Sequence, residues 1–145
     1  MPFCELEITA LPPHLRIIQR PSTIGEHLKK RRFQLRLLQS DVSKILDVCE
    51  DTISGWENER SEPYIHYYPT IISFLGYSPF DIDTSTLGGR IKKYRIENGL
   101  SQEELAYMLR VNESTVFGWE KNAHNPSINK LKLLEELMCQ KELSI

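Results

Sequence analysis

The 145-residue chain is close to neutral, with eighteen Lys and Arg against twenty Asp and Glu and a pI of about 6.1. This balance excludes indiscriminate attraction to polyanions, so a nucleic-acid surface would have to be local. Three cysteines without CxxC spacing fit a reducing compartment, and the absence of a signal-peptide pattern or a long apolar run leads us to expect a cytoplasmic protein with no membrane segment.

Four prolines, at positions 2, 12, 13 and 21, exclude a long regular helix at the start of the chain. We expect residues 1–22 to form an extended N-terminal arm. Apolar residues in this segment, among them Leu15 and Ile18, indicate that part of it packs on a domain.

Residues 23–65 recur at residues 86–128, with a constant offset of 63 and no gap. Sixteen of the 43 aligned positions are identical, against roughly three expected from average composition. A repeat of this length that occurs twice is typical of two copies of one small domain rather than of a solenoid. We therefore expect domains at residues 23–76 and 86–145, joined by a linker at residues 77–85.

Apolar residues recur at helical spacing in both copies, and no β pattern competes. The first copy predicts helices at about residues 24–35, 39–46, 50–58 and 67–75. In the second copy Asn98–Gly99 ends a helix at 87–97, and Ser101 with Glu104 forms a capping box for the next. Asn112 and Ser127 are the expected N-caps of the last two helices. The residues expected on buried faces are Leu105, Met108 and Leu109, then Ile128, Leu131, Leu134, Leu137 and Met138.

Two short helices separated by three residues, with a small residue on the first and an apolar one in the turn, have the geometry of a helix-turn-helix. The motif reads LLQSDVSKILDVCEDTISGWE at residues 37–57 and LSQEELAYMLRVNESTVFGWE at residues 100–120. These sequences resemble the lambda-repressor-like, Cro/C1-type (XRE) family. The resemblance implies an all-α fold of two tandem lambda-repressor-like helix-turn-helix bundles, with four to five helices each.

Two features depart from the family pattern. Asp47 and Arg110 occupy turn positions that commonly hold Gly, where left-handed backbone is needed, and Arg adopts that conformation less readily than Asp. Cys49 takes the N-cap position that Asn112 holds in the second copy. One interpretation of this thiol is a redox switch. The interpretation that we favour is a small, buried and inert side chain.

In this family the third helix enters the major groove, so the resemblance implies a sequence-specific, double-stranded DNA-binding transcriptional regulator with recognition helices at about 50–58 and 113–121. Gln39 and Gln102, which open the second helices, would contact the sugar-phosphate backbone. Gly55 and Gly118 would share the outward faces. The other expected DNA-binding residues are Glu50, Asp51, Thr52 and Ser54 in the first copy, and Glu113, Ser114, Thr115, Phe117 and Lys121 in the second.

The resemblance also implies two structural ion pairs, Arg32 with Glu57 and Arg95 with Glu120, each joining a first helix to a third helix. Both copies keep both partners, which supports the pairs because loss of one partner would leave an uncompensated charge. Trp56 and Trp119 are predicted to anchor the core behind the recognition helices.

Charge separates the two copies. Residues 23–76 carry seven Lys and Arg against eight Asp and Glu, whereas residues 86–139 carry eight against seven. The second domain is therefore expected to supply most of the DNA affinity. An ordinary solvated helix face is the alternative interpretation of the outward residues, and it has more weight in the first copy, where Glu50 and Asp51 would both face a polyanion. An alternative function is a protein-interaction or antitoxin-type regulatory module in which one or both domains do not bind DNA.

An enzyme has no support in the sequence, because no cluster of nucleophile, base or metal ligands is visible. We expect no cofactor, no metal site, no catalytic residue and no small-molecule effector. The expected partner is double-stranded DNA, and a homodimer is possible.

Overall fold

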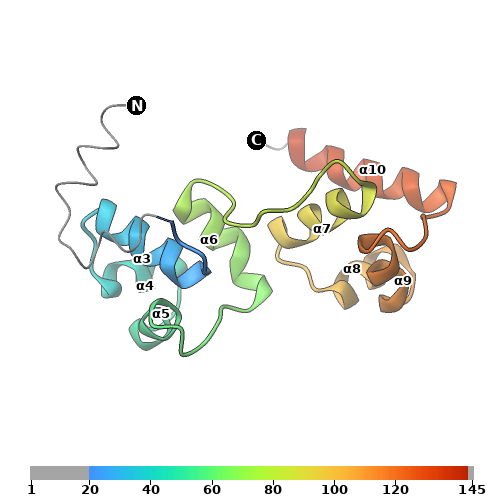
Figure 1. The fold of residues 1–145 in the computed structure, drawn as a ribbon. Helices are drawn as coiled ribbons and strands as arrows, with labels where there is room; N and C mark the ends of the chain where they lie inside the picture. Colours follow the sequence, from blue (N-terminus) through green and yellow to red (C-terminus); the bar gives the residue numbers. More distant parts are fainter. Residues whose placement is uncertain (1–19, 144–145) are drawn as a thin grey trace. The chain divides into compact units, whose positions relative to one another are not determined.

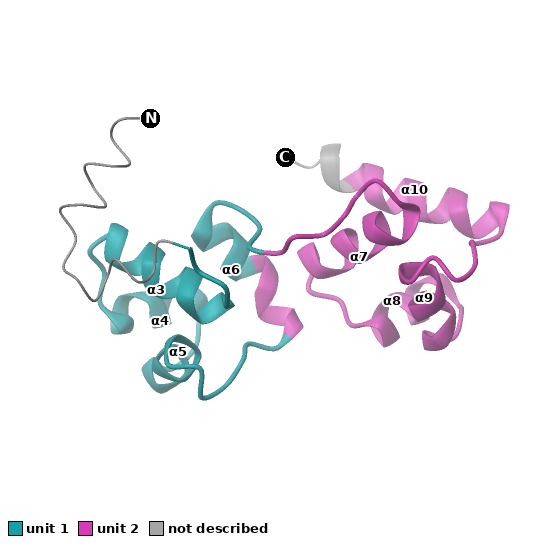
Figure 2. Ribbon diagram, in the orientation of Figure 1, with its two compact units in different colours: residues 1–64, 70–79 teal, residues 65–69, 80–145 magenta. Residues whose placement is uncertain are grey.

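The computed structural model describes residues 20–143, so nearly all of the expected arm lies outside it (Figure 1). The described residues contain eight α-helices, one short 3-10 helix and no strand, which confirms the all-α class. They divide into two compact units (Figure 2): unit 1 comprises residues 20–64 and 70–79, and unit 2 comprises residues 65–69 and 80–143. In this part of the chain no helix has both the length and the apolar character needed to span a bilayer.

Unit 1 contains α3 (Ile24–Gln34), α4 (Gln39–Leu46), α5 (Glu50–Glu57) and residues 70–75 of α6 (Tyr68–Leu75). The 3-10 helix η2 (Ile65–Tyr67) and the first two residues of α6 are assigned to unit 2. A capping box between Thr23 and Glu26 starts α3. Leu28, Val42 and Ile53 are completely buried, one from each of the first three helices. The core of unit 1 therefore lies where α3, α4 and α5 meet.

Unit 2 contains α7 (Leu87–Glu97), α8 (Gln102–Leu109), α9 (Glu113–Glu120) and α10 (Ile128–Leu143). Seven buried residues form its core: Ile91, Leu105, Ala106, Leu109, Val116, Trp119 and Leu134. Two expected core residues are exposed instead, Met108 by 44% and Ile128 by 73%. The buried stripe of α8 runs through Leu105, Ala106 and Leu109, which turns Met108 outward, and Ile128 is the first residue of α10.

The helix starts follow the capping signals only in part. Ser101 and Glu104 form the predicted capping box, and Ser127 Oγ accepts from the Lys130 amide at 3.4 Å. Asn112 is at the N-cap of α9, as expected, although its side chain makes no capping hydrogen bond. Cys49 is at the N-cap of α5.

A glycine in each first helix sets how closely that helix approaches the third. A Cβ at Gly25 in α3 would overlap the carbonyl group of Trp56 in α5, and one at Gly88 in α7 would overlap the carbonyl oxygen of Trp119 in α9. Each first helix therefore packs directly against the backbone at the end of the third helix.

Candidate nucleic-acid interface

The same tight turn joins the second and third helices in both units. Asp47 and Arg110 end α4 and α8 in the left-handed region, with φ of 54° and 56°. The Val48 amide then donates to the Ser43 carbonyl at 2.9 Å, and the Val111 amide to the Ala106 carbonyl at 3.0 Å. Because a non-glycine residue in this region costs roughly 1–2 kcal/mol, both turns carry some backbone strain.

A buried, bidentate ion pair connects the first helix of each unit to the third. In unit 1, Arg32 Nε donates to Glu57 Oε1 at 2.7 Å and Nη2 donates to Oε2 at 2.8 Å. In unit 2 the corresponding distances from Arg95 to Glu120 are 2.6 and 3.2 Å. All four side chains are at most 10% exposed. Paired charges in such surroundings hold the two helices in one relative orientation.

The ion pairs extend to the neighbouring loop and to the start of the second helix. Arg32 Nη1 donates to the Leu37 carbonyl at 3.2 Å, and Arg95 Nη1 donates to the Leu100 carbonyl at 3.1 Å. Gln39 donates to Glu57 Oε2 at 2.9 Å, and Gln102 donates to Glu120 Oε2 at 2.8 Å. An amide nitrogen carries two hydrogens, so each glutamine keeps a second N–H that can be donated to an acceptor beside the start of the helix.

The outward face of α9 is largely free of core contacts. Glu113, Ser114 and Phe117 are exposed, and Thr115 is half-buried. Lys121, which follows the helix, lies with Nζ 5.7 Å from the centre of the Phe117 ring. Val116 and Trp119 on the opposite side are buried in the core of unit 2, so the tryptophan backs the helix and the phenylalanine faces outward.

The outward face of α5 has a different chemistry. Glu50 and Asp51 are exposed, while Thr52 and Ser54 are half-buried. Arg60, from the loop after α5, donates from Nη2 to Ser54 Oγ at 3.0 Å. Sequence reasoning missed Arg60, because helical periodicity does not show where a loop residue lies relative to the helix before it.

Gly55 and Gly118 do not belong to the outward faces, and that expectation is wrong. Both are buried. The Gly55 carbonyl accepts from the Arg60 amide at 2.9 Å, and the Gly118 carbonyl accepts from the Ala123 amide at the same distance. The loop after each third helix therefore folds back over its glycine.

Cys49 is exposed, which contradicts the expectation of a buried thiol. Its sulfur lies 2.9 Å from Thr52 Oγ1. Hydrogen bonding to the Thr52 side chain, and then to the Thr52 backbone, lowers the pKa of this thiol from its ordinary value.

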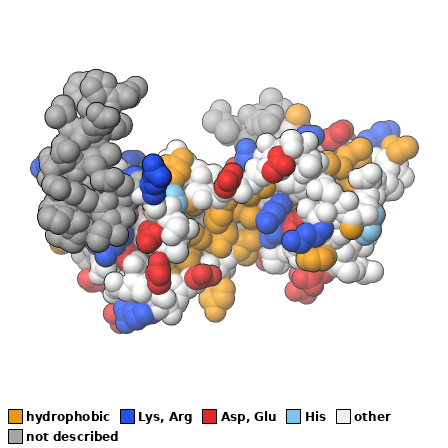
Figure 3. All heavy atoms as spheres, in the orientation of Figure 1, with side chains coloured by type: hydrophobic (Ala, Val, Ile, Leu, Met, Phe, Trp, Pro, Cys, Tyr) orange, Lys and Arg blue, Asp and Glu red, His pale blue; other side chains and the backbone are white. Residues whose placement is uncertain are grey.

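Basic and acidic side chains are interspersed on the face drawn in Figure 3, in keeping with the near-neutral charge of the chain. The described residues on that face do not form one continuous basic patch, which is the surface expected of a protein that binds nucleic acid regardless of sequence. The residues described here contain no group of three or more His, Cys, Asp and Glu placed to hold a metal ion.

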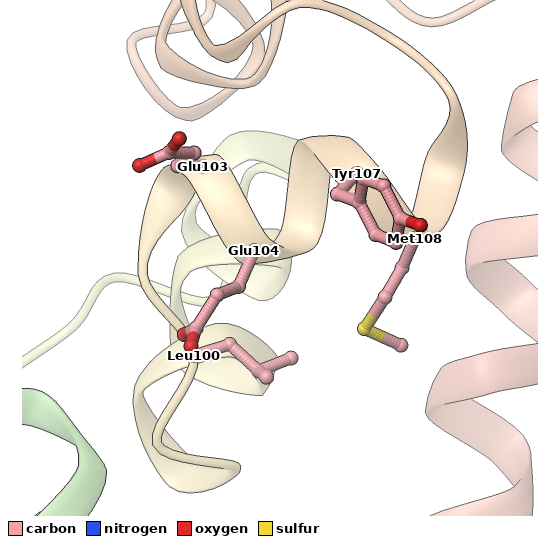
Figure 4. Close-up of a pocket in the computed structure, with 5 residues that line it drawn as sticks. All are labelled: Leu100, Glu103, Glu104, Tyr107 and Met108. Carbon is pink, nitrogen blue, oxygen red and sulfur yellow. The ribbon is translucent and has the colours of Figure 1, made fainter.

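A pocket of about 430 Å³ lies along α8, and five residues line it: Leu100, Glu103, Glu104, Tyr107 and Met108 (Figure 4). The Glu104 carboxylate lies beside Leu100 at one end, and Tyr107 and Met108 come from the far end of the helix. Tyr107 is 86% exposed. The lining is mainly apolar with two carboxylates at its edge, so it is a different kind of surface from the face of α9.

Comparison with known proteins places a helix-turn-helix domain in unit 2. Residues 91–138 match the helix-turn-helix family, and this segment includes α8, the turn and all of α9. The chain is also 26% identical over 98 residues to a protein of Aeropyrum pernix named "Putative HTH-type transcriptional regulatory protein". The alignment covers 68% of this chain and 26% of that relative, so the chain spans about a quarter of its length. No solved structure matched the chain.

Proposed function

We propose that the protein is a sequence-specific, double-stranded DNA-binding transcriptional regulator with two helix-turn-helix domains, at residues 23–76 and 86–145. The observation that carries the proposal is the buried ion pair with its attached glutamine, present in both units. This arrangement fixes the third helix while leaving one of its faces exposed. The helix-turn-helix match in unit 2 and the name of the relative support a DNA-binding regulator in general.

In the second domain α9 would lie in the major groove. Glu113 can accept a hydrogen bond from cytosine N4, Ser114 can donate to several base acceptors, and Phe117 can contact a thymine methyl group. Gln102 and the first amides of α8 would contact phosphate, and Lys121 would neutralise another. Trp119 and the Arg95–Glu120 pair would hold α9 at the required angle.

In the first domain α5 would take the same role with weaker electrostatic support, because Glu50 and Asp51 both face outward. We infer that the second domain supplies most of the affinity. With two recognition helices on one chain, the protein would contact two half-sites, in the way that a dimer of one-domain proteins does.

The test is selection of bound duplexes from a random pool, followed by fluorescence anisotropy with the selected duplex. Phe117→Ala and Ser114→Ala should weaken binding more than Asp51→Ala, and Tyr107→Ala, on the pocket side of α8, serves as the matched control. If about six phosphates are contacted, affinity should fall roughly 10³-fold between 50 and 200 mM salt. If only substitutions in α5 abolished binding, the assignment of most of the DNA affinity to α9 would be overturned.

A protein-interaction module is the second candidate, and the α8 pocket is the observation in its favour. The exposed Tyr107 and Met108 form an apolar surface that DNA binding does not use. A protein that acts only through this surface would show no salt-dependent affinity for duplex DNA, and Tyr107→Ala would impair it while Phe117→Ala would not.

A further inference from the structure

The two third helices present different groups at one aligned position. Ser54 in α5 corresponds to Phe117 in α9. The cation beside Ser54 is Arg60, which aligns with Ala123, whereas the cation beside Phe117 is Lys121, which aligns with Asn58. The two copies therefore share the same framework, but the side chains at the centre of the outward face differ in their chemistry.

Two hydrogen bonds hold Arg60 on α5. Its backbone amide donates to the Gly55 carbonyl at 2.9 Å, and its guanidinium donates to Ser54 Oγ at 3.0 Å. Asn58 Nδ2 also reaches Ser54 Oγ, at 3.2 Å. Gly55 permits the approach, since a Cβ there would lie 2.8 Å from Ser61 Oγ in the same loop. The loop thus places the guanidinium beside an outward residue of the helix, and Ser54 orients it.

The chemistry of this face matches a G·C base pair. In the major groove guanine presents two acceptors, O6 and N7, and the planar guanidinium of arginine can donate to both. Arginine has five N–H groups, so the bond to Ser54 leaves others for a base. Glu50 and Asp51, near the start of the same helix, are acceptors suited to cytosine N4. Phe117 in unit 2 instead offers an apolar ring, which suits a thymine methyl group.

We propose that Arg60 reads a guanine for the first domain, with Ser54 as its positioning residue, so that the two domains recognise half-sites of different sequence. The inference rests on the proposed DNA-binding function and adds to it. The first domain, although less basic than the second, then contributes sequence preference at a G·C pair.

The experiment uses the full chain and its selected duplex. Each guanine in the footprint is replaced in turn by 7-deazaguanine, which lacks the N7 acceptor, or by adenine. At one of these positions, replacement of the guanine by adenine should weaken binding of the wild-type chain by about 5- to 150-fold. Arg60→Ala should lose a similar factor on the unmodified duplex and become insensitive to replacement at that position, while Arg60→Lys should recover only part of it.

Lys44→Ala is the matched control, because it removes one exposed positive charge from α4 of unit 1. It should leave the response to every replacement unchanged, and Ser54→Ala should reduce the response at the Arg60 position only. A uniform loss of affinity for all duplexes with Arg60→Ala, or no loss, would overturn the role of Arg60 while leaving DNA binding intact. A wild-type chain that prefers no duplex would instead overturn the proposed function and this inference together.

Discussion

Replacing Glu120 by Gln should strongly destabilise unit 2, because the change removes one charge and keeps the side-chain size. Glu120 satisfies three donors: Nε and Nη2 of Arg95 and the amide of Gln102. A glutamine offers one acceptor oxygen, and its own NH₂ would face donors. The guanidinium would then be left buried without a counter-charge, since the Arg95 side chain is only 10% exposed. Breaking a buried pair in this way costs about 3–5 kcal/mol.

Urea unfolding followed by far-UV circular dichroism and by tryptophan fluorescence measures this loss, because Trp119 lies in the affected core. Glu135→Gln is the control, since it makes the same change at an exposed position of α10. It should cost less than about 0.5 kcal/mol. A loss below about 1 kcal/mol for Glu120→Gln would refute the view that this pair holds α9 in place.

Three further changes test other parts of the structure. Gly88→Ala should destabilise unit 2 by about 1–3 kcal/mol in urea unfolding, because the added Cβ meets the Trp119 carbonyl oxygen. At a helical glycine without such a neighbour, the same substitution would instead stabilise the protein by roughly 0.5–1 kcal/mol. Arg110→Gly should stabilise the α8–α9 turn by about 1 kcal/mol, since φ is 56° there, and an unchanged urea midpoint would argue against strain. Hydrogen bonds from the Ser22 backbone and side chain lower the pKa of Glu26, so its stabilising contribution is present above the unfolded pKa and is lost as pH falls through the folded pKa. Unfolding free energies measured across the acid range should therefore fall less steeply for Glu26→Gln than for the wild type.

The helix positions could be predicted from the sequence because local signals mark them. The ranges expected for α4 and α7 agree with the structure, and the capping box at Ser101 forms as the residues indicated. The partners of Arg32 and Arg95 could be named only because the sequences resemble a known family; composition and spacing alone do not identify a contact between residues 25 positions apart.

Features that depend on tertiary packing could not be predicted. The identity of Gly25 and Gly88 is explained only when each first helix is seen against the backbone of the third. Met108 satisfies the helical spacing and still faces outward, because the neighbouring Ala106 completes the buried stripe. Arg60 reaches the face of α5 through a fold of the following loop, which no periodic pattern encodes.

Amide NMR of the chain during titration with its selected duplex tests the central claim most directly. DNA binding through the third helix predicts the largest shift changes at the exposed positions of α9 and at the first amides of α8, with the amides of Tyr107 and Met108 nearly unchanged. The placement of α9 in the major groove would be contradicted if saturating duplex left the amide chemical shifts of α9 unchanged. It would also be contradicted if the duplex changed only the amide shifts on the Tyr107 side of α8.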